Sequence, residues 1–240
     1  MVLTKIGDLL YLKRIKLYNT ALIHHNADNE FNAMTYNDVD KRKKAFIFEL
    51  DNVLYPEKDY LFQVYYLFAG LLEYTKLIDA GKITDLMISA YNEEGKARVF
   101  DRLKKELNVD EKYRKNLDDL LLTARLPLKL LLYKKMLNLL QEIVVDRKKV
   151  FIVTNGDPVQ QLNKIKQVEW HGLENYLVAY FAEGTMAKPE PDVIHTLLKE
   201  HDLLRKDVLM IENSEEDRLC AEVCGIDCIN AGEFLDTTQL

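Results

Sequence analysis

The sequence has 240 residues, of which 48% are hydrophobic and 30% are charged, so it can bury a core large enough for one domain with an insertion or for two domains. Its formal net charge of −6 argues against a general nucleic-acid-binding protein, because such proteins are usually basic. No apolar run approaches the roughly 18 residues of a membrane span, so no membrane association is expected. Three cysteines do not make a disulfide framework, and they indicate a reducing, cytoplasmic location.

The first 43 residues precede any clear strand, and we interpret residues 1–43 as an N-terminal extension. Apolar residues recur at helical spacing up to Leu22, and an asparagine-rich stretch and the charged run Asp38–Lys44 follow. Two hypotheses stay open for this segment. Either Met34 is the natural start and the leader is an addition, or the leader is a docking helix. A leader that resists limited proteolysis would argue against the first hypothesis.

Two acids come directly after the first predicted strand. The run Ala45–Phe48 is apolar and partly aromatic, as in a buried strand, and Glu49 and Asp51 follow it. Side chains two positions apart on a strand point to the same side, and the carboxyl ends of strands in open α/β sheets frame the ligand crevice. The two carboxylates could therefore converge on one cation or phosphate. An ordinary buried strand with a solvated polar end explains this stretch equally well.

The next part of the chain, residues 58–145, has helical spacing throughout and no strand pattern. The apolar positions predict helices over residues 60–74, 84–107 with a break near Gly95, 110–125 and 128–142. Pro127 would stand in the first turn of the last of these helices. The region therefore reads as an all-helical insertion with the size of a small domain.

Strands and helices alternate after residue 146. Short apolar runs predict strands over residues 150–153, 176–181, 208–211 and 226–229, with helices between them. This alternation is typical of an α/β fold with a parallel sheet. We expect residues 44–57 and 146–240 to form one Rossmann-like core, interrupted by the helical insertion.

Polar residues follow the predicted core strands at the edge of the sheet where catalysis belongs in such folds. They are Glu49 and Asp51, Thr154 and Asn155, Lys188, and Asn213 with Asp217. A carboxylate can attack phosphorus and hold Mg²⁺, and a second acid can exchange protons with the leaving oxygen and with water. A hydroxyl and a lysine can stabilise the charge of a transferring phosphoryl group.

In this order and spacing, the sequence resembles the haloacid dehalogenase-like hydrolases, which are mostly Mg²⁺-dependent phosphatases. The four motifs that carry the resemblance read Glu49-Leu-Asp51-Asn-Val53, Thr154, Lys188 in Ala-Lys-Pro-Glu-Pro, and Glu212-Asn213-Ser214-Glu-Glu-Asp217. The resemblance covers about residues 44–232, and the helical insertion is similar to the cap domain of that family. The form Asp-Asn-Val-Leu-Tyr-Pro gives a weaker resemblance to members like the pyrimidine 5′-nucleotidases.

The resemblance implies a role for each residue of the first three motifs. Glu49 would be the nucleophile and a metal ligand, and Asp51 the general acid and base, with its backbone carbonyl as a second metal ligand. Thr154 and Asn155 would hold the phosphoryl group, and Lys188 would stabilise its charge. The substrate would be a small phosphorylated metabolite, over which the cap closes to exclude water.

The fourth motif would complete a Mg²⁺ site with Asn213 and Asp217. Two positions depart from the family pattern. Glu49 stands where the family has aspartate, and its extra methylene moves the carboxylate by about 1.5 Å, the length of one carbon–carbon bond. Asn213 replaces an acid and removes one negative charge from the metal shell, so Mg²⁺ affinity should fall.

Three functions are therefore compatible with the sequence. The first is a phosphoric monoester hydrolase that uses Glu49 and Mg²⁺. The second is a catalytically degenerate member that binds a phosphorylated ligand or a protein partner. The third is a metal-free dehalogenase, which the presence of Asp51 disfavours. Nothing in the sequence indicates an oligomeric state.

Overall fold

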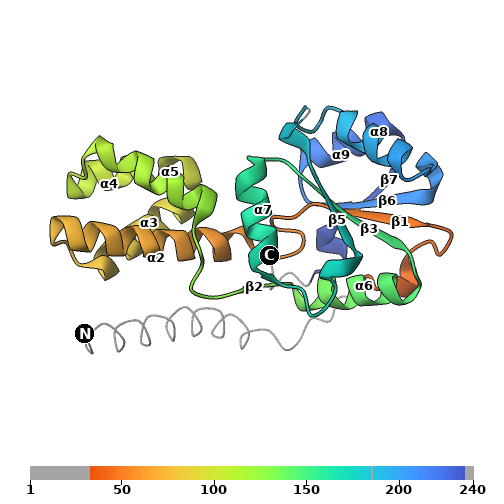
Figure 1. The fold of residues 1–240 in the computed structure, drawn as a ribbon, viewed down its shortest axis with the longest axis horizontal. Coiled ribbons are helices and arrows are strands. Elements are labelled where there is room, and N and C mark those ends of the chain that lie inside the picture. The colour runs from red at the N-terminus through yellow and green to blue at the C-terminus, as the bar shows by residue number, and fades with distance from the viewer. Residues whose placement is uncertain (1–32, 185, 236–240) are drawn as a thin grey trace.

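A computed structural model describes residues 33–184 and 186–235. Figure 1 shows two parts, a group of helices on one side and a sheet with helices on both of its faces on the other. The predicted N-terminal helix lies outside the described residues. Within the described ranges, no helix is long and apolar enough to cross a membrane.

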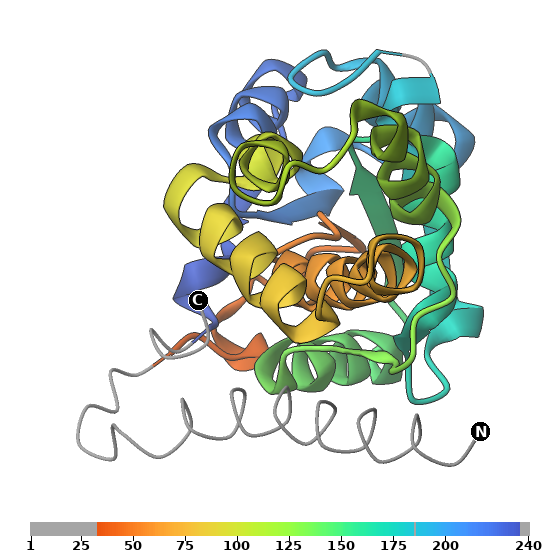
Figure 2. The same cartoon turned by 90° about the vertical axis from the view of Figure 1, so that its left-hand side faces the viewer.

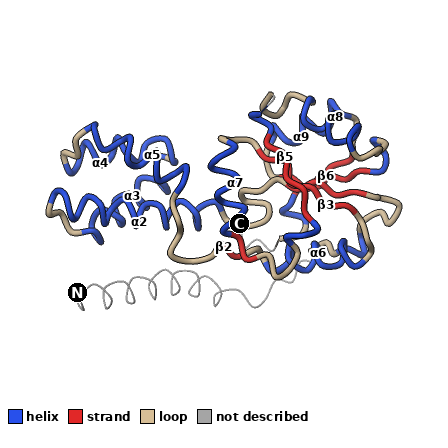
Figure 3. Tube along the Cα trace, viewed as in Figure 1, coloured by secondary structure: helices blue, strands red, loops and turns tan. Residues whose placement is uncertain are grey.

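The sheet has five parallel strands in the order β5-β3-β1-β6-β7. Figure 3 shows the strands gathered on one side of the molecule with helices around them, and in Figure 1 β1 runs between β3 and β6. Their bounds are β1 Ala45–Phe48, β3 Lys149–Thr154, β5 Leu177–Phe181, β6 Val208–Glu212 and β7 Asp227–Asn230. The prediction of an α/β fold with a parallel sheet is confirmed.

Both faces of the central strand are buried, which explains why its sequence is a continuous apolar run. Phe46 and Phe48 belong to a core cluster on one face, where α6 (Lys134–Val145) packs. Ala45 and Ile47 belong to the cluster on the other face, under α8 (Asp192–Glu200) and α9 (Glu215–Cys224). The sheet is thus covered by helices on two sides.

The helical insertion forms a cap, which faces the viewer in Figure 2 and contains four α-helices. They are α2 Glu57–Lys76, α3 Ala80–Glu94, α4 Val99–Leu107 and α5 Arg114–Thr123. The predicted break at Gly95 is confirmed: this residue has φ of +83°, which a residue with a side chain rarely adopts, and it ends α3. The helix α5 contacts α7 (Pro158–Gln167), the first core helix after β3.

One helix of the insertion begins later than predicted. The expected helix over 128–142 starts at Lys134, and the residues before it include a short strand, β2 (Leu130–Leu131), that pairs with β4 (Val168–Glu169). Backbone N–H groups of this stretch find partners outside a helix: that of Leu128 donates to Gln63 at 2.8 Å. Periodicity could not reveal these long-range partners. The predicted cap range 58–145 includes α6, whereas α6 lies against β3 in the structure.

Residues 34–43, which the sequence placed in the extension, pack against the core. Tyr36 and Val39 are buried, and the hydroxyl of Tyr36 donates to Asp146 at 2.8 Å. The ammonium of Lys43 is buried and donates to the carbonyls of Lys206 and Val208, both at 2.9 Å. These contacts fix the chain directly before β1.

The cysteines form no disulfide. Cys220 and Cys224 are free and lie on the buried face of α9, and Cys228 is partly buried. Cys220 and Cys224 are therefore core residues.

Candidate active site

The predicted site residues gather at the carboxyl ends of β1, β3 and β6, next to a cavity of about 310 Å³. Core and cap both contribute to its wall. The lining residues are Glu49, Asp51, Glu57, Lys96, Asn155, Gly156, Gln160, Gln161, Lys164, Asn213, Ser214, Glu216 and Asp217. Since these residues come from separate segments of the chain, the fold is what brings the four motifs together.

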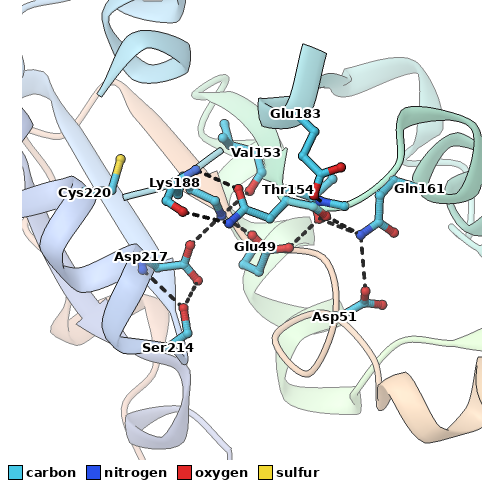
Figure 4. A network of polar contacts seen from close by, with 12 residues as sticks. Glu49, Asp51, Val153, Thr154, Gln161, Glu183, Lys188, Ser214, Asp217 and Cys220 are labelled. Carbon is cyan, nitrogen blue, oxygen red and sulfur yellow. Dashed lines mark hydrogen bonds and ion pairs between the residues drawn. The ribbon is translucent and has the colours of Figure 1, made fainter. Parts of the chain in front are cut away.

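Glu49 is the centre of the site (Figure 4). Its backbone N–H donates to the carbonyl of Ile211 at 3.2 Å, so it continues the pairing of β1 with β6 by one residue. Its side chain is buried, and the two carboxylate oxygens face two different partners. The hydroxyl of Thr154 donates to one oxygen, and the ammonium of Lys188 donates to the other.

Lys188 is the buried cation of the site, with a side chain that is 0% exposed. Its ammonium contacts Glu49, lies 2.5 Å from a carboxylate oxygen of Asp217, and donates to the carbonyl of Val153 at 2.9 Å. Asp217 is itself fixed by Ser214, whose hydroxyl donates to it at 2.7 Å and caps α9. Two carboxylates therefore share one ammonium group.

The electrostatics of this cluster follow from burial. Burial raises the pKa of Glu49, and the nearby Asp217 raises it further, while Lys188 and Thr154 act in the opposite direction. Burial alone would lower the pKa of Lys188, but the two carboxylates outweigh it and the pKa lies above its ordinary value. Both directions agree with a cluster in which two acids compete for one cation, so Lys188 stays charged and Glu49 is the group that is hard to ionise.

Asp51 faces away from this cluster, toward α7. The hydroxyl of Tyr55 donates to one of its oxygens at 2.6 Å, and the ammonium of Lys164 lies 2.5 Å from the other. The side chain of Lys164 is only 3% exposed, so this is a second buried ion pair. Burial and the adjacent carboxylate raise the pKa of the Tyr55 phenol well above its usual range, which keeps the phenol a hydrogen-bond donor. The two acids of the first motif thus have separate partners.

Two residues that were not predicted from the sequence, Lys164 and Gln161, also belong to the site. They are the buried residues of α7, whereas Val159 and Leu162 of the same helix are exposed. The amide nitrogen of Gln161 donates to Thr154 at 3.2 Å and to the carbonyl of Asn155 at 2.5 Å. The spacing of three residues, which puts two polar side chains on one helix face, was the available signal. It was not decisive, because a polar stripe usually faces solvent.

Gly156 permits the close approach of Gln161. The glycine has φ of +103°, and a Cβ atom at this position would lie 2.9 Å from the amide nitrogen of Gln161. In the described part of the chain, the other amide atom of Gln161, Oε1, is buried without a hydrogen-bond partner. Gln161 as a residue lines the cavity, with its amide nitrogen directed at Thr154 and the carbonyl of Asn155.

The two asparagines of the predicted site hold the backbone. Asn155 accepts from the N–H of Lys188 at 2.9 Å and donates to its carbonyl at 3.1 Å, which fixes the loop that carries the lysine. Asn213 donates to the carbonyl of Asn52 at 3.2 Å and so connects the fourth motif with the first. Both line the cavity, and their roles toward a phosphoryl group and a metal stay predictions.

The arrangement does not fit the divalent cation that the family pattern implies. Among the residues described, no group of three His, Cys, Asp or Glu side chains could hold a metal ion. The nearest two carboxylates, Glu49 and Asp217, have the ammonium of Lys188 between them. Asp51 points its carboxylate to Lys164, and Asn213 contributes no charge. A hard cation prefers converging carboxylate oxygens, which these residues do not offer here.

The fold and the site together define a capped α/β hydrolase with a carboxylate at the end of its central strand. The sequence matches the family described as haloacid dehalogenase-like hydrolase over residues 46–231, and the chain belongs to this family. The resemblance seen in the sequence is confirmed. No curated protein matches the chain.

Solved structures of similar fold include a hydrolase from Streptococcus pneumoniae TIGR4, with 16% identity and a TM-score of 0.51 over 78% of this chain and 92% of that one. A protein assigned as a β-phosphoglucomutase from Thermotoga maritima has 18% identity and a TM-score of 0.53 over 76% and 82% of the two chains. A dehalogenase has 14% identity and a TM-score of 0.51 over 80% and 86%. At these identities the likeness concerns the fold alone.

Proposed function

We propose that this haloacid dehalogenase-like hydrolase cleaves a small phosphate ester, with Glu49 as the nucleophile. One observation carries the proposal: Glu49, Thr154, Lys188 and Asp217 come from four distant segments and form one buried polar cluster beside a cavity that both core and cap line. A buried carboxylate with a lysine and a hydroxyl against it has the parts that nucleophilic phosphoryl transfer requires. The proposed substrate is a small phosphorylated metabolite.

The reaction would take two steps. A carboxylate oxygen of Glu49 forms a bond to phosphorus while the bond from phosphorus to the leaving oxygen breaks, and the leaving oxygen takes a proton through Asp51. Water, deprotonated at Asp51, then attacks the same phosphorus, phosphate leaves and the Glu49 carboxylate is regenerated. Lys188 and Thr154 supply the donors for the added negative charge.

Mg²⁺ was the cofactor predicted from the sequence. Because the donors at this site do not converge on a cation, no step of the proposed reaction uses the metal, and its presence is a variable of the experiment. Glu49 and Asn213, the two departures from the family pattern, both reduce the fit to Mg²⁺.

A second candidate is a catalytically degenerate protein that binds a phosphorylated ligand or a protein partner. The observation that favours it is the pairing of Asp51 with Lys164 and Tyr55, which holds the carboxylate toward α7. An acid held in this way is not free to reach a leaving oxygen, and a misplacement of about 1 Å can cost roughly 100-fold in rate.

A turnover screen tests the proposal. Phosphate monoesters, acyl phosphates and a 2-halocarboxylate would be offered to the natural protein, to Glu49→Gln and to Glu49→Asp, each with Mg²⁺ and with a chelator. Phosphate release by the natural protein that Glu49→Gln abolishes supports the proposal. Release by Glu49→Asp alone supports the degenerate reading, and halide release from the halocarboxylate supports a dehalogenase.

A further inference from the structure

We propose that two buried ammonium groups, those of Lys188 and Lys164, take the place of the divalent cation, and that this chain does not bind Mg²⁺ at Glu49 and Asp217. The inference deepens the proposed function and rests on it for the location of the site. If the lysines replace the metal, hydrolysis or ligand binding by this protein should persist in the presence of a chelator.

Lys188 already occupies the place between the two acids. Its ammonium touches both acids that should share a metal, and its side chain is fully buried. A Mg²⁺ ion at the same carboxylates has to compete with this ammonium for their oxygens, so it needs further carboxylate charge that Glu49 and Asp217 alone do not supply. Asn155 holds the backbone of Lys188 at two atoms and so fixes the loop that presents the ammonium to both acids.

Lys164 is the second buried cation, and it pairs with the other acid of the first motif. It neutralises Asp51 from α7, whose buried side chains are the polar Gln161 and Lys164. The carboxylate of Asp51 contacts Tyr55 and Lys164. Figure 4 shows it away from Glu49, beside Gln161. The first motif therefore offers a cation one side-chain carboxylate, that of Glu49, beside the backbone carbonyl of Asp51, and both carboxylate oxygens of Glu49 already accept hydrogen bonds.

Asn213 holds the backbone of the first motif with its side-chain amide. Its nitrogen donates to the carbonyl of Asn52, so the amide serves as a strut between two loops. An aspartate at this position would add the carboxylate that hard cations prefer. The site thus has one carboxylate fewer and a longer side chain at Glu49. The ammonium groups of Lys188 and Lys164 supply the positive charge that a metal ion would otherwise provide.

The experiment measures Mg²⁺ binding without relying on turnover. The thermal midpoint of the full chain would be followed against MgCl₂, with NaCl at matched ionic strength as the control. The same titration would be made for Glu49→Asp/Asn213→Asp and for each single substitution. Asp217→Asn would be measured both in the natural protein and in the double variant. We expect no saturable Mg²⁺ effect for the natural protein. We expect the double variant to gain a shift of about 5–10 °C at a Mg²⁺ concentration near 100 times its Kd, which Asp217→Asn added to it removes.

The outcomes separate this inference from the proposed function. A saturable shift for the natural protein that Asp217→Asn removes would overturn the inference, as would phosphate release that needs Mg²⁺; the proposed function would then stand. Absence of both turnover and Mg²⁺ binding would overturn the proposed function and leave the inference intact. If neither the double variant nor the single variants bind Mg²⁺, the assignment of the loss to Glu49 and Asn213 is wrong.

Discussion

Replacing Lys188 by methionine should be among the most damaging changes to stability in this protein. The substitution keeps the length of the side chain but leaves Glu49 and Asp217 buried together without their cation. Removing one partner of a buried ion pair costs about 3–5 kcal/mol in the free energy of unfolding. For a chain of this size, such a loss lowers the thermal midpoint by roughly 6–20 °C.

The cost of Lys188→Met should also depend on pH. Burial already raises the pKa of Glu49 above its ordinary 4.5, and the loss of Lys188 raises it further. A carboxyl group with a raised native pKa binds its proton more tightly in the native state than in the unfolded chain. The free energy of unfolding of the variant therefore falls as the pH rises from about 4.5 through the raised native value. The variant should lose less stability near pH 5 than near pH 8.

Urea unfolding is a suitable assay, because Trp170 is the single tryptophan and is buried in the core, where its indole N–H donates to the carbonyl of Ile165 at 2.8 Å. Lys199→Met is the matched control, since Lys199 is an exposed lysine on α8. A free energy of unfolding within about 1 kcal/mol of the natural protein at both pH values would refute this reasoning, because it would mean that the cluster is hydrated rather than buried.

Three further substitutions test other contacts of the site. Thr154→Val removes the hydroxyl on the central carboxylate and should cost about 1.5–3 kcal/mol in unfolding free energy, whereas Thr154→Ser should cost less because it keeps the donor. Lys164→Met should cost about 3 kcal/mol by thermal unfolding, whereas Lys166→Met, at an exposed position two residues further on α7, should be neutral; equal effects would contradict a buried pair. Lys96→Met should change stability by less than about 1 kcal/mol, since this side chain is 64% exposed, and a larger loss in a denaturant titration would show a stronger connection between cap elements than its ion pair indicates.

Much of the fold was predictable because its signals are local. Continuous apolar runs marked the strands β1, β3 and β6, which are buried on both faces, and the polar residues after them marked the edge where the site lies. Gly95 marked a helix end by its own backbone requirement. The late start of α6 was missed, because the residues before it are held by partners far away in the sequence, such as Gln63.

The site was predictable in its location more than in its chemistry. The motifs placed Glu49, Thr154, Lys188 and Asp217 at one edge, and in the structure these four side chains touch. The direction of the Asp51 side chain was not predictable, since it depends on Lys164, a residue in a helix that carries no motif. A lysine in such a helix is usually solvent-exposed, so only the packed structure reveals it as part of the site.

The central place of β1 has a consequence for the order in which the protein forms. Thr154 and Lys188 follow Glu49 by 105 and 139 residues, so the first strand is synthesised long before the neighbours that complete it. The cap helices α2–α5 lie between them in the chain and rely largely on contacts near in sequence, which form quickly. During synthesis, the cap should therefore assemble before the sheet closes, and the unpaired backbone edges of β1 stay open to wrong pairing until β3 and β6 arrive.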